Sequence, residues 1–408
     1  MTYRIVELEV TKALPSISLS DQTGIALLVR YRERVVGFIM HQAQPNTIIE
    51  SVELARLITQ QLSSKILQEQ IRAELIPCRQ LSIPCLTVAI CTKDRTDNLA
   101  RCLNSLLQLE QSTLEILVVD NAPSDSQTKD LVSELIKVRY TCEPKPGLDF
   151  ARNRAINEAK SEMIAFIDDD VVVDRNWLAG ISEVWQENPD AAAFTGLVLP
   201  YELETEAQII FERGGGFRRG FDKIRYSKVL PGNPLYPCGA GIFGAGCNMA
   251  FRRQVLLELG GFDEALDTGA TLPGGGDLDM FYRVIRAGYP LVYEPQYMVF
   301  HQHRQDLTKL RRQYWSWGLG FMAFVVKSYQ TDVVKRPQLR RLIWWWFQYQ
   351  YRQAKRSLTG RNPIPISMSL AELWGGIMGL LGEYQRSLLR IESIKAKSTL
   401  NLNLAVKK

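Results

Sequence analysis

Three adjacent aspartates, Asp168, Asp169 and Asp170, follow the apolar run Met163–Ile167. Adjacent carboxylates repel one another strongly unless a cation lies close to them. Oxygen ligands suit Mg²⁺ or Mn²⁺, and such ions typically bind one or two carboxylates together with substrate phosphates. A solvated acidic turn, or carboxylates that cap a helix near Asn176, is the alternative. The position directly behind a buried strand favours the metal site.

A further carboxylate, Asp277, follows the glycine run Gly274 to Gly276. Glycines let a backbone approach a ligand closely. The apolar spacing of Phe281, Val284 and Ile285 predicts a helix that starts at or just after Asp277. Asp277 is therefore either the N-cap of this helix or a general base that removes a proton from an acceptor hydroxyl.

Two of the three histidines, His301 and His303, lie in VFHQHR just after an expected strand. We expect their rings to point to opposite faces of the chain, so that the two do not share one role. One of them could bind a metal through a neutral imidazole. The alternative is an exposed polar pair at the end of the strand.

Two arginines, Arg152 and Arg154, stand at the start of an expected helix in LDFARNRAINEA. An arginine at a helix N-terminus can bind phosphate, helped by the helix dipole. The alternative is solvation at the surface, which we expect for at least one of the two.

The elements that must position these residues alternate between strands and helices from Cys85 onward. This alternation predicts an α/β domain with a mainly parallel sheet, in which ligands bind beyond the carboxyl ends of the strands. Asp94, Asp120 and the aspartate triplet all fall at such ends, and Asp97 could cap the first helix. The expected strands are Leu86–Cys91, Leu114–Val119, Val138–Thr141 and Met163–Ile167.

The chain divides into three predicted parts. Residues 1–80 form a small α+β module, with a strand at Tyr3–Val10, a hairpin around Arg32 and Glu33, and a long helix from Ser51. Residues 84–306 form the α/β domain, after a linker at Pro77–Pro84. Residues 307–408 form a helical region.

Two segments outside the regular pattern could cover a site or touch a partner. The Gly- and Pro-rich stretch Tyr201–Ala245 is interpreted as long loops, the natural lid over a site, rather than core. Arg340–Arg352, RRLIWWWFQYQYR, is interpreted as an amphipathic packing helix, although tryptophan beside arginine also suits a membrane interface. A further segment, Ile364–Gly382, is expected to be a buried helix rather than a membrane span, with a helix lying on a membrane surface as the open alternative.

Composition excludes several classes of protein. A net charge of +5 does not indicate nucleic acid as the main ligand. The seven scattered cysteines fit no zinc clip or disulfide framework, which indicates a reducing compartment. The first residues do not resemble a signal peptide. We therefore expect a cytoplasmic protein, with peripheral contact at the inner face of the plasma membrane left open.

Five segments taken together carry a family resemblance over roughly residues 84–306. They resemble family 2 glycosyltransferases with the GT-A fold, the fold of nucleotide-diphospho-sugar transferases. Each segment is a weak signal alone, but their order and spacing are highly specific. The segments are VAICTKDRTDNLARCLNSLL, EILVVDNAPSD, GLDFARNRAINEAKSEMIAFIDDDVVVDRNWL, GAGCNMAFRR and GGGDLDMFYRVIRAGY.

The resemblance implies a metal-dependent, inverting enzyme that moves a sugar from a nucleoside-diphosphate sugar, with a UDP-sugar favoured, to an acceptor hydroxyl. It implies that Asp94 and Asp120 hold the nucleobase and that Asp277 is the catalytic base. Asp168 and Asp170 match an Asp-x-Asp pair that binds ribose, diphosphate and Mg²⁺ or Mn²⁺.

Further roles follow from the same resemblance. His301 matches a histidine that completes the metal site in some members, and Arg152 and Asp169 are expected to line the donor site. A lipid-linked or other glycan acceptor, in bacterial polysaccharide or glycolipid synthesis, would suit such an enzyme. The C-terminal helices are its candidate contact with a membrane.

Departures from the family pattern narrow this interpretation. Many members have Glu before the base where this chain has Gly276. RRQYWSW only partly matches the Gln-x-x-Arg-Trp motif of processive members, which indicates a non-processive enzyme. Two alternatives stay open: a sugar nucleotidyltransferase, which the glycine-free loop TKDRTDN disfavours, and a non-catalytic nucleotide-sugar-binding or assembly protein.

Overall fold

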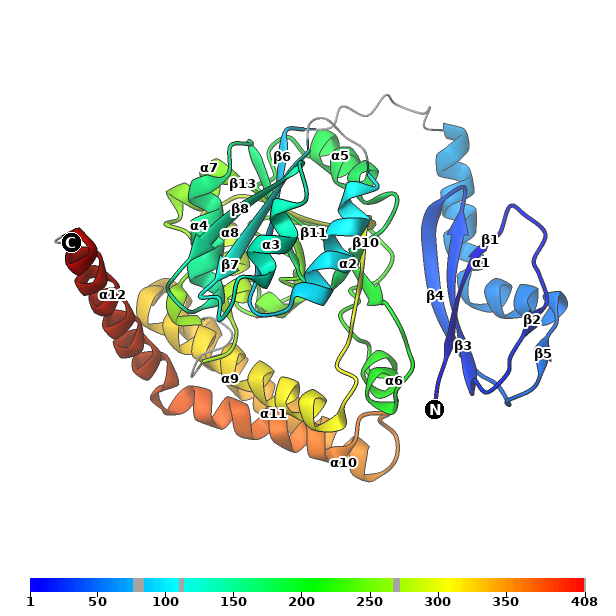
Figure 1. The fold of residues 1–408 in the computed structure, drawn as a ribbon. Coiled ribbons are helices and arrows are strands. Elements are labelled where there is room, and N and C mark those ends of the chain that lie inside the picture. The colour runs from blue at the N-terminus through cyan, green and yellow to red at the C-terminus, as the bar shows by residue number, and fades with distance from the viewer. Residues whose placement is uncertain (76–83, 110–113, 267–271, 407–408) are drawn as a thin grey trace.

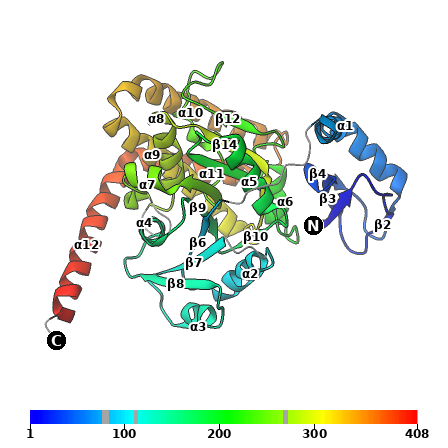
Figure 2. The ribbon, with the colours of Figure 1, turned by 90° about the horizontal axis from the view of Figure 1, so that it is seen from above.

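The computed structural model describes residues 1–75, 84–109, 114–266 and 272–406, with side chains up to Lys397. The linker expected at Pro77–Pro84 lies outside the described residues, apart from Pro84. A small N-terminal sheet stands beside a larger α/β domain, and long helices run along the base of that domain (Figures 1 and 2).

The N-terminal part is a three-stranded sheet in the order β1 (Arg4–Glu9), β3 (Gly24–Tyr31), β4 (Arg34–Gln42). The hairpin turn falls at Arg32 and Glu33, whose φ angles of 46° and 70° are those of a two-residue type I′ turn. The long helix α1 (Ser51–Leu75) covers one face of the sheet, and β2 (Ile17–Ser18) pairs with β5 (Ile48–Ile49).

The N-terminal sheet is buried on both faces. Along β3, Ile25, Leu27 and Val29 pack in one core with α1, whereas Ala26 and Leu28 belong to the main core of the α/β domain. This alternation is what a strand with a period of two produces between two apolar layers. The N-terminal part is therefore packed against the α/β domain through its sheet.

The central sheet has nine strands within the described residues, in the order β10-β14-β11-β13-β9-β6-β7-β8, with β12 paired to β14. Strands β8, β7, β6 and β9 are parallel, and β13 runs antiparallel to β9 and β11. The predicted α/β class with a mainly parallel central sheet is confirmed. The strand bounds are β6 (Leu86–Thr92), β7 (Leu114–Asn121), β8 (Val138–Glu143), β9 (Met163–Asp168), β10 (Val171–Val173), β11 (Ala193–Pro200), β12 (Ile224–Tyr226), β13 (Asn248–Arg252) and β14 (Leu291–His301).

Helices cover both faces of this sheet. One face packs against α2 (Thr96–Leu107), α3 (Gln127–Ser133) and α5 (Trp177–Glu187). The other packs against α4 (Leu148–Glu158), α7 (Arg253–Glu258) and α8 (Gly276–Arg286). The expectation that Asp97 caps α2 is wrong, because the helix begins at Thr96 and its N-cap residue is Arg95.

The expectation of uninterrupted loops over Tyr201–Ala245 is also wrong. The segment contains helix α6 (Glu206–Arg213) and strand β12, and Ile209 and Phe211 are buried. A capping box starts α6: Thr205 accepts a hydrogen bond from the Gln208 backbone N–H, and the Gln208 side chain accepts from Thr205. The Thr-x-x-Gln signal was present in the sequence, but flanking glycines hid the short helix.

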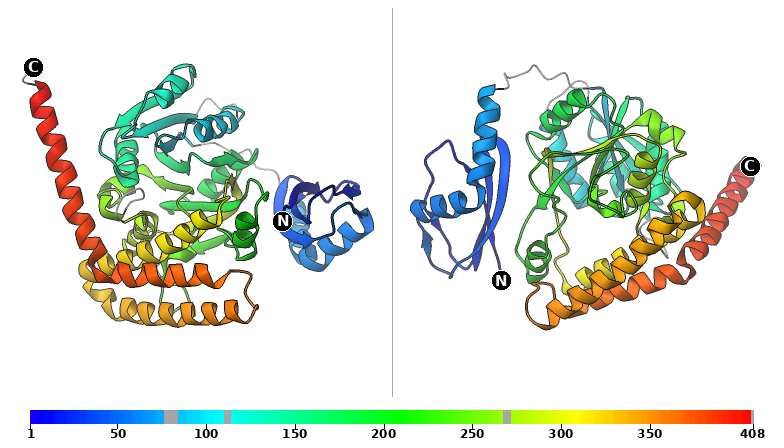
Figure 3. Two further views of the ribbon diagram at one scale, coloured as in Figure 1. Left: turned by 60° about the horizontal axis from the view of Figure 1, so that its bottom comes forward. Right: turned by 180° about the vertical axis from the view of Figure 1, so that it is seen from behind.

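Four long helices follow the α/β domain: α9 (Leu307–Thr331), α10 (Arg336–Leu358), α11 (Ile366–Met378) and α12 (Tyr384–Val406). The first three lie side by side below the domain, and α12 extends away from them (Figure 3). The expected buried helix at Ile364–Gly382 is only half buried, since Leu370 and Trp374 of α11 are 50% and 57% exposed. Within the described residues, none of the helices has the length and apolar character to cross a bilayer.

Candidate functional site

Strand register brings the predicted carboxylates to one edge of the sheet. Thr92 of β6 pairs with Asp120 of β7, and Cys91 of β6 pairs with Asp168 of β9. Because these strands are parallel, the chain leaves each of them on the same side, and Asp94 follows two residues after β6. The site is thus assembled at the carboxyl edge, where α/β sheets bind ligands.

The three adjacent aspartates have different surroundings: Asp169 has a structural role, whereas Asp168 and Asp170 lie beside His301. Asp169 is buried and accepts a hydrogen bond of 2.7 Å from the Thr92 hydroxyl, and its other oxygen lies 2.6 Å from Arg95. Asp168 and Asp170 instead join His301, and one ligand atom from each residue lies within 4.8 Å of the others. Asp169 therefore holds the turn, while its neighbours form a candidate metal centre.

His301 is placed by the pairing of β14 with β10, which sets His301 opposite Val171. Its Nε2 lies 3.3 Å from Oδ1 of Asp170. Burial lowers the pKa of His301 to about 4, so the ring is neutral near pH 7. The pKa of Asp168 is raised to about 6, first by burial and then by the charge of Asp170.

A chain of buried hydrogen bonds fixes the tautomer of His301. Glu212 of α6 accepts from Nε2 of His303 at 2.9 Å, and the Nδ1 atoms of His303 and His301 lie 3.0 Å apart. A neutral His303 that donates from Nε2 to Glu212 accepts at Nδ1, and His301 then donates from its own Nδ1. The lone pair at Nε2 of His301 then faces a carboxylate oxygen that makes no hydrogen bond, Oδ1 of Asp170. Two facing acceptors fit a divalent cation between them.

The expectation that His301 and His303 point to opposite faces is wrong. Residues two apart in an extended chain share a face, because strand side chains repeat every two residues. The alternative of an exposed polar pair is also wrong, since His301 and His303 are only 6% and 3% exposed. The two rings therefore lie in series, with His301 at the candidate metal centre and His303 behind it.

Asp277 lies in the first turn of α8 and is not its N-cap. The N-cap position is held by Gly275, whose φ of 104° is left-handed. Oδ2 of Asp277 accepts a hydrogen bond of 3.1 Å from the Gly246 backbone N–H, and Oδ1 accepts from the Leu278 N–H at 2.8 Å. Gly246 lies in the GAGCNMAFRR segment, which therefore orients the carboxylate.

Arg152 and Asp149 form a buried pair beside Asp277. Nη1 of Arg152 donates to Oδ1 of Asp149 at 2.9 Å. A methyl group on Gly246 would lie 3.1 Å from Oδ2 of Asp277 and 3.2 Å from Nη2 of Arg152, so the Asp277 and Arg152 side chains meet at Gly246. Burial raises the pKa of Asp149 to about 7.

The departure at Gly276 has a structural explanation. A Cβ atom at this position would lie 2.0 Å from Oδ2 of Asp149, so a larger residue has no room there. Asp149 brings a carboxylate to the space beside the helix start, and its Oδ2 makes no hydrogen bond. Asp149 was not singled out from the sequence, where it reads as an ordinary acidic residue in the first turn of α4.

Asp120 and Asp94 line the far end of the same edge. Asp120 is fully buried, accepts a hydrogen bond of 3.0 Å from the Tyr140 hydroxyl, and has no hydrogen-bond partner at Oδ1. Burial raises the pKa of Asp120. Asp94 is exposed, has a φ of 53°, and accepts from the Ser124 backbone N–H at 2.9 Å. That hydrogen bond lowers the pKa of Asp94.

The two arginines of α4 differ in burial, and a third arginine, from outside α4, also contacts the site. Arg152 is buried in the site, whereas Arg154 is 42% exposed and pairs with Glu158, as expected for a solvated arginine. Sequence reasoning missed Arg95, which contacts both Asp169 and Asp170. Its position next to Asp94, directly behind a strand end, was the available signal.

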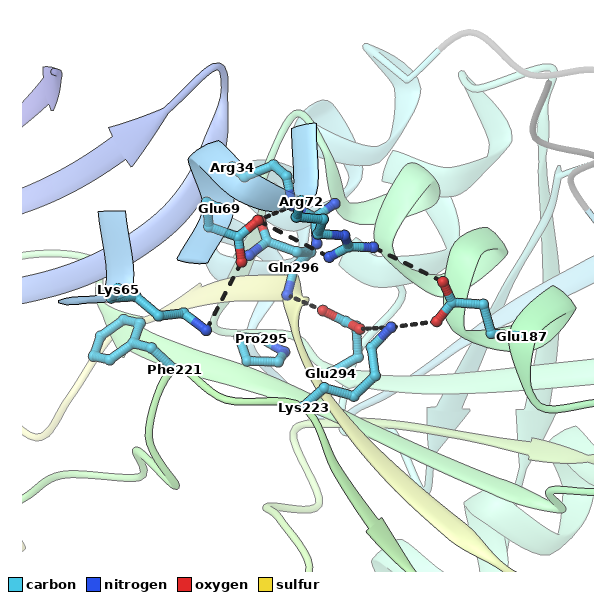
Figure 4. A pocket seen from close by; sticks show the side chains of 10 residues that line it. All are labelled: Arg34, Lys65, Glu69, Arg72, Glu187, Phe221, Lys223, Glu294, Pro295 and Gln296. Atoms are coloured by element: carbon cyan, nitrogen blue, oxygen red, sulfur yellow. Dashed lines mark hydrogen bonds and ion pairs between the residues drawn. The ribbon is translucent and has the colours of Figure 1, made fainter. Parts of the chain in front are cut away.

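A separate cavity of about 260 Å³ lies between α1 and β14 (Figure 4). None of the candidate site residues lines it. Its cations and carboxylates pair with one another: Lys65 with Glu69 at 3.8 Å, and Lys223 with Glu294 at 2.9 Å. This cavity lies in the interface between the N-terminal part and the α/β domain.

Comparison with known proteins agrees with this geometry. Residues 87–260 match the family model described as "Glycosyl transferase family 2". Residues 87–260 therefore form a glycosyl transferase family 2 domain. The GT-A fold expected from the resemblance is consistent with this family and with the sheet topology.

Three similar proteins illustrate how distant the relationships are. A glucosyl-dolichyl phosphate glucuronosyltransferase of Haloferax volcanii is 22% identical over 44% of this chain and 56% of its own length. The succinoglycan biosynthesis protein ExoM of Rhizobium meliloti is 27% identical over 56% of this chain and 71% of its own length. A structure of a mannosyltransferase from Pyrobaculum calidifontis, in complex with GDP-Man and Mn²⁺, is 16% identical, with a TM-score of 0.45 over 83% of this chain and 88% of that one. The chain thus spans little more than half the length of the first of these relatives.

Proposed function

We propose that the chain is a metal-dependent, inverting glycosyltransferase that moves a sugar from a nucleoside-diphosphate sugar to an acceptor hydroxyl. The observation that carries the proposal is the convergence of Asp168, Asp170 and His301, with Asp277 close enough that its charge adds to the effects of burial and Asp170 in raising the pKa of Asp168. Such a reaction needs two kinds of group in one site: groups that stabilise a leaving diphosphate and a base for the acceptor.

The donor would bind along the strand ends. The free Oδ1 of buried Asp120 suits an N–H group of a nucleobase such as uracil, with Asp94 at the exposed rim. This acceptor supports a UDP-sugar as the favoured donor. Asp168, Asp170 and His301 would hold Mg²⁺ or Mn²⁺, which when bound supplies positive charge opposite a diphosphate.

The acceptor would bind on the side of α8. The Asp277 carboxylate, held by the Gly246 N–H, would take the proton of the attacking hydroxyl. Arg152 is buried and cationic, and it lies between Asp149 and Asp277. Its positive charge would balance the negative charges of Asp149 and Asp277 while Asp277 orients the acceptor hydroxyl. Asp169 and Arg95 would hold the turn that carries the metal ligands.

The acceptor class is proposed to be a lipid-linked or other glycan, in polysaccharide or glycolipid synthesis, with one sugar added per encounter. The glucosyl-dolichyl phosphate named for one relative and the succinoglycan named for another support these two classes. The enzyme would then work in the cytoplasm, in peripheral contact with the inner face of the plasma membrane.

Calorimetric titration with UDP, GDP, dTDP and CDP, each with Mn²⁺ and with EDTA, tests the donor site. We expect one nucleotide to bind, with an affinity that depends on Mn²⁺. Binding that is the same in EDTA would contradict the metal site. Absence of binding by all four nucleotides would favour a non-catalytic assembly role.

A further inference from the structure

Charge is distributed very unevenly along the chain. Residues 307–408 contain 18 Lys and Arg against four Asp and Glu, a net charge of +14. Residues 1–306 contain 31 Lys and Arg against 40 Asp and Glu, a net charge of −9. The overall charge of +5 therefore hides an acidic body that carries a basic helical region. Such asymmetry points to an anionic partner for the basic part.

Much of this positive charge lies on one face of helix α10. Its sequence, RPQLRRLIWWWFQYQYRQAKRSL, has six cations and no acidic residue. Trp344 and Trp345 are 68% and 44% exposed, and the exposed Arg341 and Arg352 lie one to two turns before and after them. The exposed residues recur three and four apart, which places them on one helix face.

The opposite face of α10 is already occupied. Leu339, Leu342 and Trp346 are buried, and the Trp346 ring packs against Gly376 of α11. The exposed tryptophans are therefore not needed to attach α10 to the rest of the protein. They stay exposed, because no other helix or strand of the described chain covers them.

The exposed cations of α10 have no acidic partner among the residues that the structure describes. In contrast, arginines of the acidic body are paired: Arg30 with Asp174, and Arg95 with Asp169 and Asp170. Unpaired cations beside large apolar side chains are typical of an interface with anionic lipids. The unpaired set on α10 is Arg340, Arg341, Arg352, Lys355 and Arg356.

Exposed apolar side chains are also present on α11 and on the chain that follows it. Leu370 and Trp374, four residues apart on α11, are 50% and 57% exposed, and Leu381 and Leu389 are each 66% exposed. Exposed apolar residues rimmed by charge mark interaction sites. The helices themselves lie together at one side of the α/β domain (Figure 3).

We propose that the exposed face of α10, with the exposed residues of α11, docks on the surface of an anionic lipid bilayer. Arginine and lysine would contact anionic headgroups, while the indole rings would enter the headgroup level beside them. A phosphate backbone of nucleic acid would match the cations but would leave Trp344, Trp345 and Trp374 without an apolar partner. The charge and the exposed apolar area together therefore favour the bilayer.

Docking here would bring lipid close to the acceptor side of the proposed active site. Helix α9 packs against the loop that presents Asp277: a Cβ on Gly275 would lie 2.7 Å from the Gly320 carbonyl oxygen of α9. Lys327 of α9 also pairs with Asp279 of α8. This consequence rests on the proposed function, whereas the docking itself rests only on the helical surface.

Vesicle flotation with the full chain tests the docking without any catalytic step. We expect binding to vesicles of equal phosphatidylcholine and phosphatidylglycerol to exceed binding to phosphatidylcholine alone by at least about tenfold, and to weaken in high salt. Equal binding to both vesicles, or no binding to either, would overturn the proposal. Tight binding to duplex DNA without vesicle binding would overturn it in favour of nucleic acid.

Two double variants and a matched control locate the surface. Trp344→Ser with Trp345→Ser, and separately Arg340→Glu with Arg341→Glu, should each lower binding to anionic vesicles by about tenfold or more. Lys129→Glu with Lys137→Glu makes the same charge change at exposed positions around α3 and should leave binding within about twofold. Wild-type binding by both α10 variants would overturn the proposal. Circular dichroism and nucleotide affinity distinguish lost docking from lost folding or a lost donor site.

Discussion

The strand-end site and the α10 surface are both rich in charge, but they use it in opposite ways. In the site, buried carboxylates pair with Arg95 and Arg152, and the groups left without a partner are single buried oxygens such as Oδ1 of Asp120. On α10, exposed cations have no acidic partner among the described residues. Buried unmatched acceptors suit a small ligand of fixed geometry, whereas exposed unmatched cations suit an extended anionic surface. Variants of the buried site test one side of this contrast, and the vesicle experiments test the other.

The largest effect is expected from Asp170→Ala. This change removes a carboxylate that faces His301 at 3.3 Å and also pairs with Arg95 at 2.8 Å. Nucleotide binding should lose its dependence on Mn²⁺ completely, as measured by calorimetry with and without EDTA. Asp125→Ala, which changes an exposed aspartate in the same edge loops, is the control. Metal-dependent binding that survives in Asp170→Ala would remove this residue from the metal site.

Asp277→Asn should separate binding from catalysis. The amide keeps the shape of the carboxylate but cannot take a proton, so transfer should fall by at least about 100-fold. Nucleotide affinity should stay near that of the wild type and serves as the internal control. Initial rates at saturating donor and acceptor measure the effect, and an unchanged rate would contradict the role of general base.

A smaller effect is expected from the groups behind His301. Removing His303 frees the tautomer of His301, and loss of such a supporting partner typically costs about 10–100-fold in metal affinity. Mn²⁺ titration monitored by electron paramagnetic resonance reports this affinity without any turnover. Glu212→Gln preserves the side-chain volume at the end of this hydrogen-bond chain and should lower Mn²⁺ affinity less than His303→Ala does. Mn²⁺ affinity that is unchanged in both variants would show that metal binding by His301 does not depend on these hydrogen bonds.

The smallest effect is expected from pH. Burial and the charge of Asp170 raise the pKa of Asp168 to about 6, so this carboxyl takes up a proton as pH falls through that value. A proton on a metal ligand competes with the cation, so Mn²⁺ affinity should be full above pH 6 and fall by up to about tenfold per pH unit below it. The same Mn²⁺ titration at constant ionic strength measures the slope. A flat profile between about pH 5 and about pH 7, roughly one unit on either side of that pKa, would contradict binding through Asp168.

Sequence reasoning predicted the architecture well because the signals were local and repeated. Apolar runs with an aspartate at or just beyond their ends marked β6, β7 and β9, and parallel pairing of these strands brings Asp94, Asp120 and Asp168 to one edge. Turn residues marked the hairpin at Arg32 and Glu33. Each of these features depends only on strand periodicity and strand direction.

The features that were missed depend on contacts between distant segments. Glu212 lies 91 residues before His303, in a helix hidden among glycines, so the hydrogen-bond chain behind His301 had no local signal. Asp149 fills the space left by Gly276 only because α4 and α8 start side by side. The error about His301 and His303 was different, because the period of two for a strand already places both rings on one face.

Release of nucleoside diphosphate from a panel of nucleotide sugars tests the central claim most directly. The wild type, incubated with Mn²⁺ or with EDTA, is compared with Asp277→Asn and Asp170→Ala. We predict that the wild type releases diphosphate from one donor only when Mn²⁺ is present, and that both variants are strongly impaired. Wild-type protein that binds a nucleotide sugar in Mn²⁺ but never cleaves it, with any acceptor supplied, would contradict an enzyme and favour a nucleotide-sugar-binding protein.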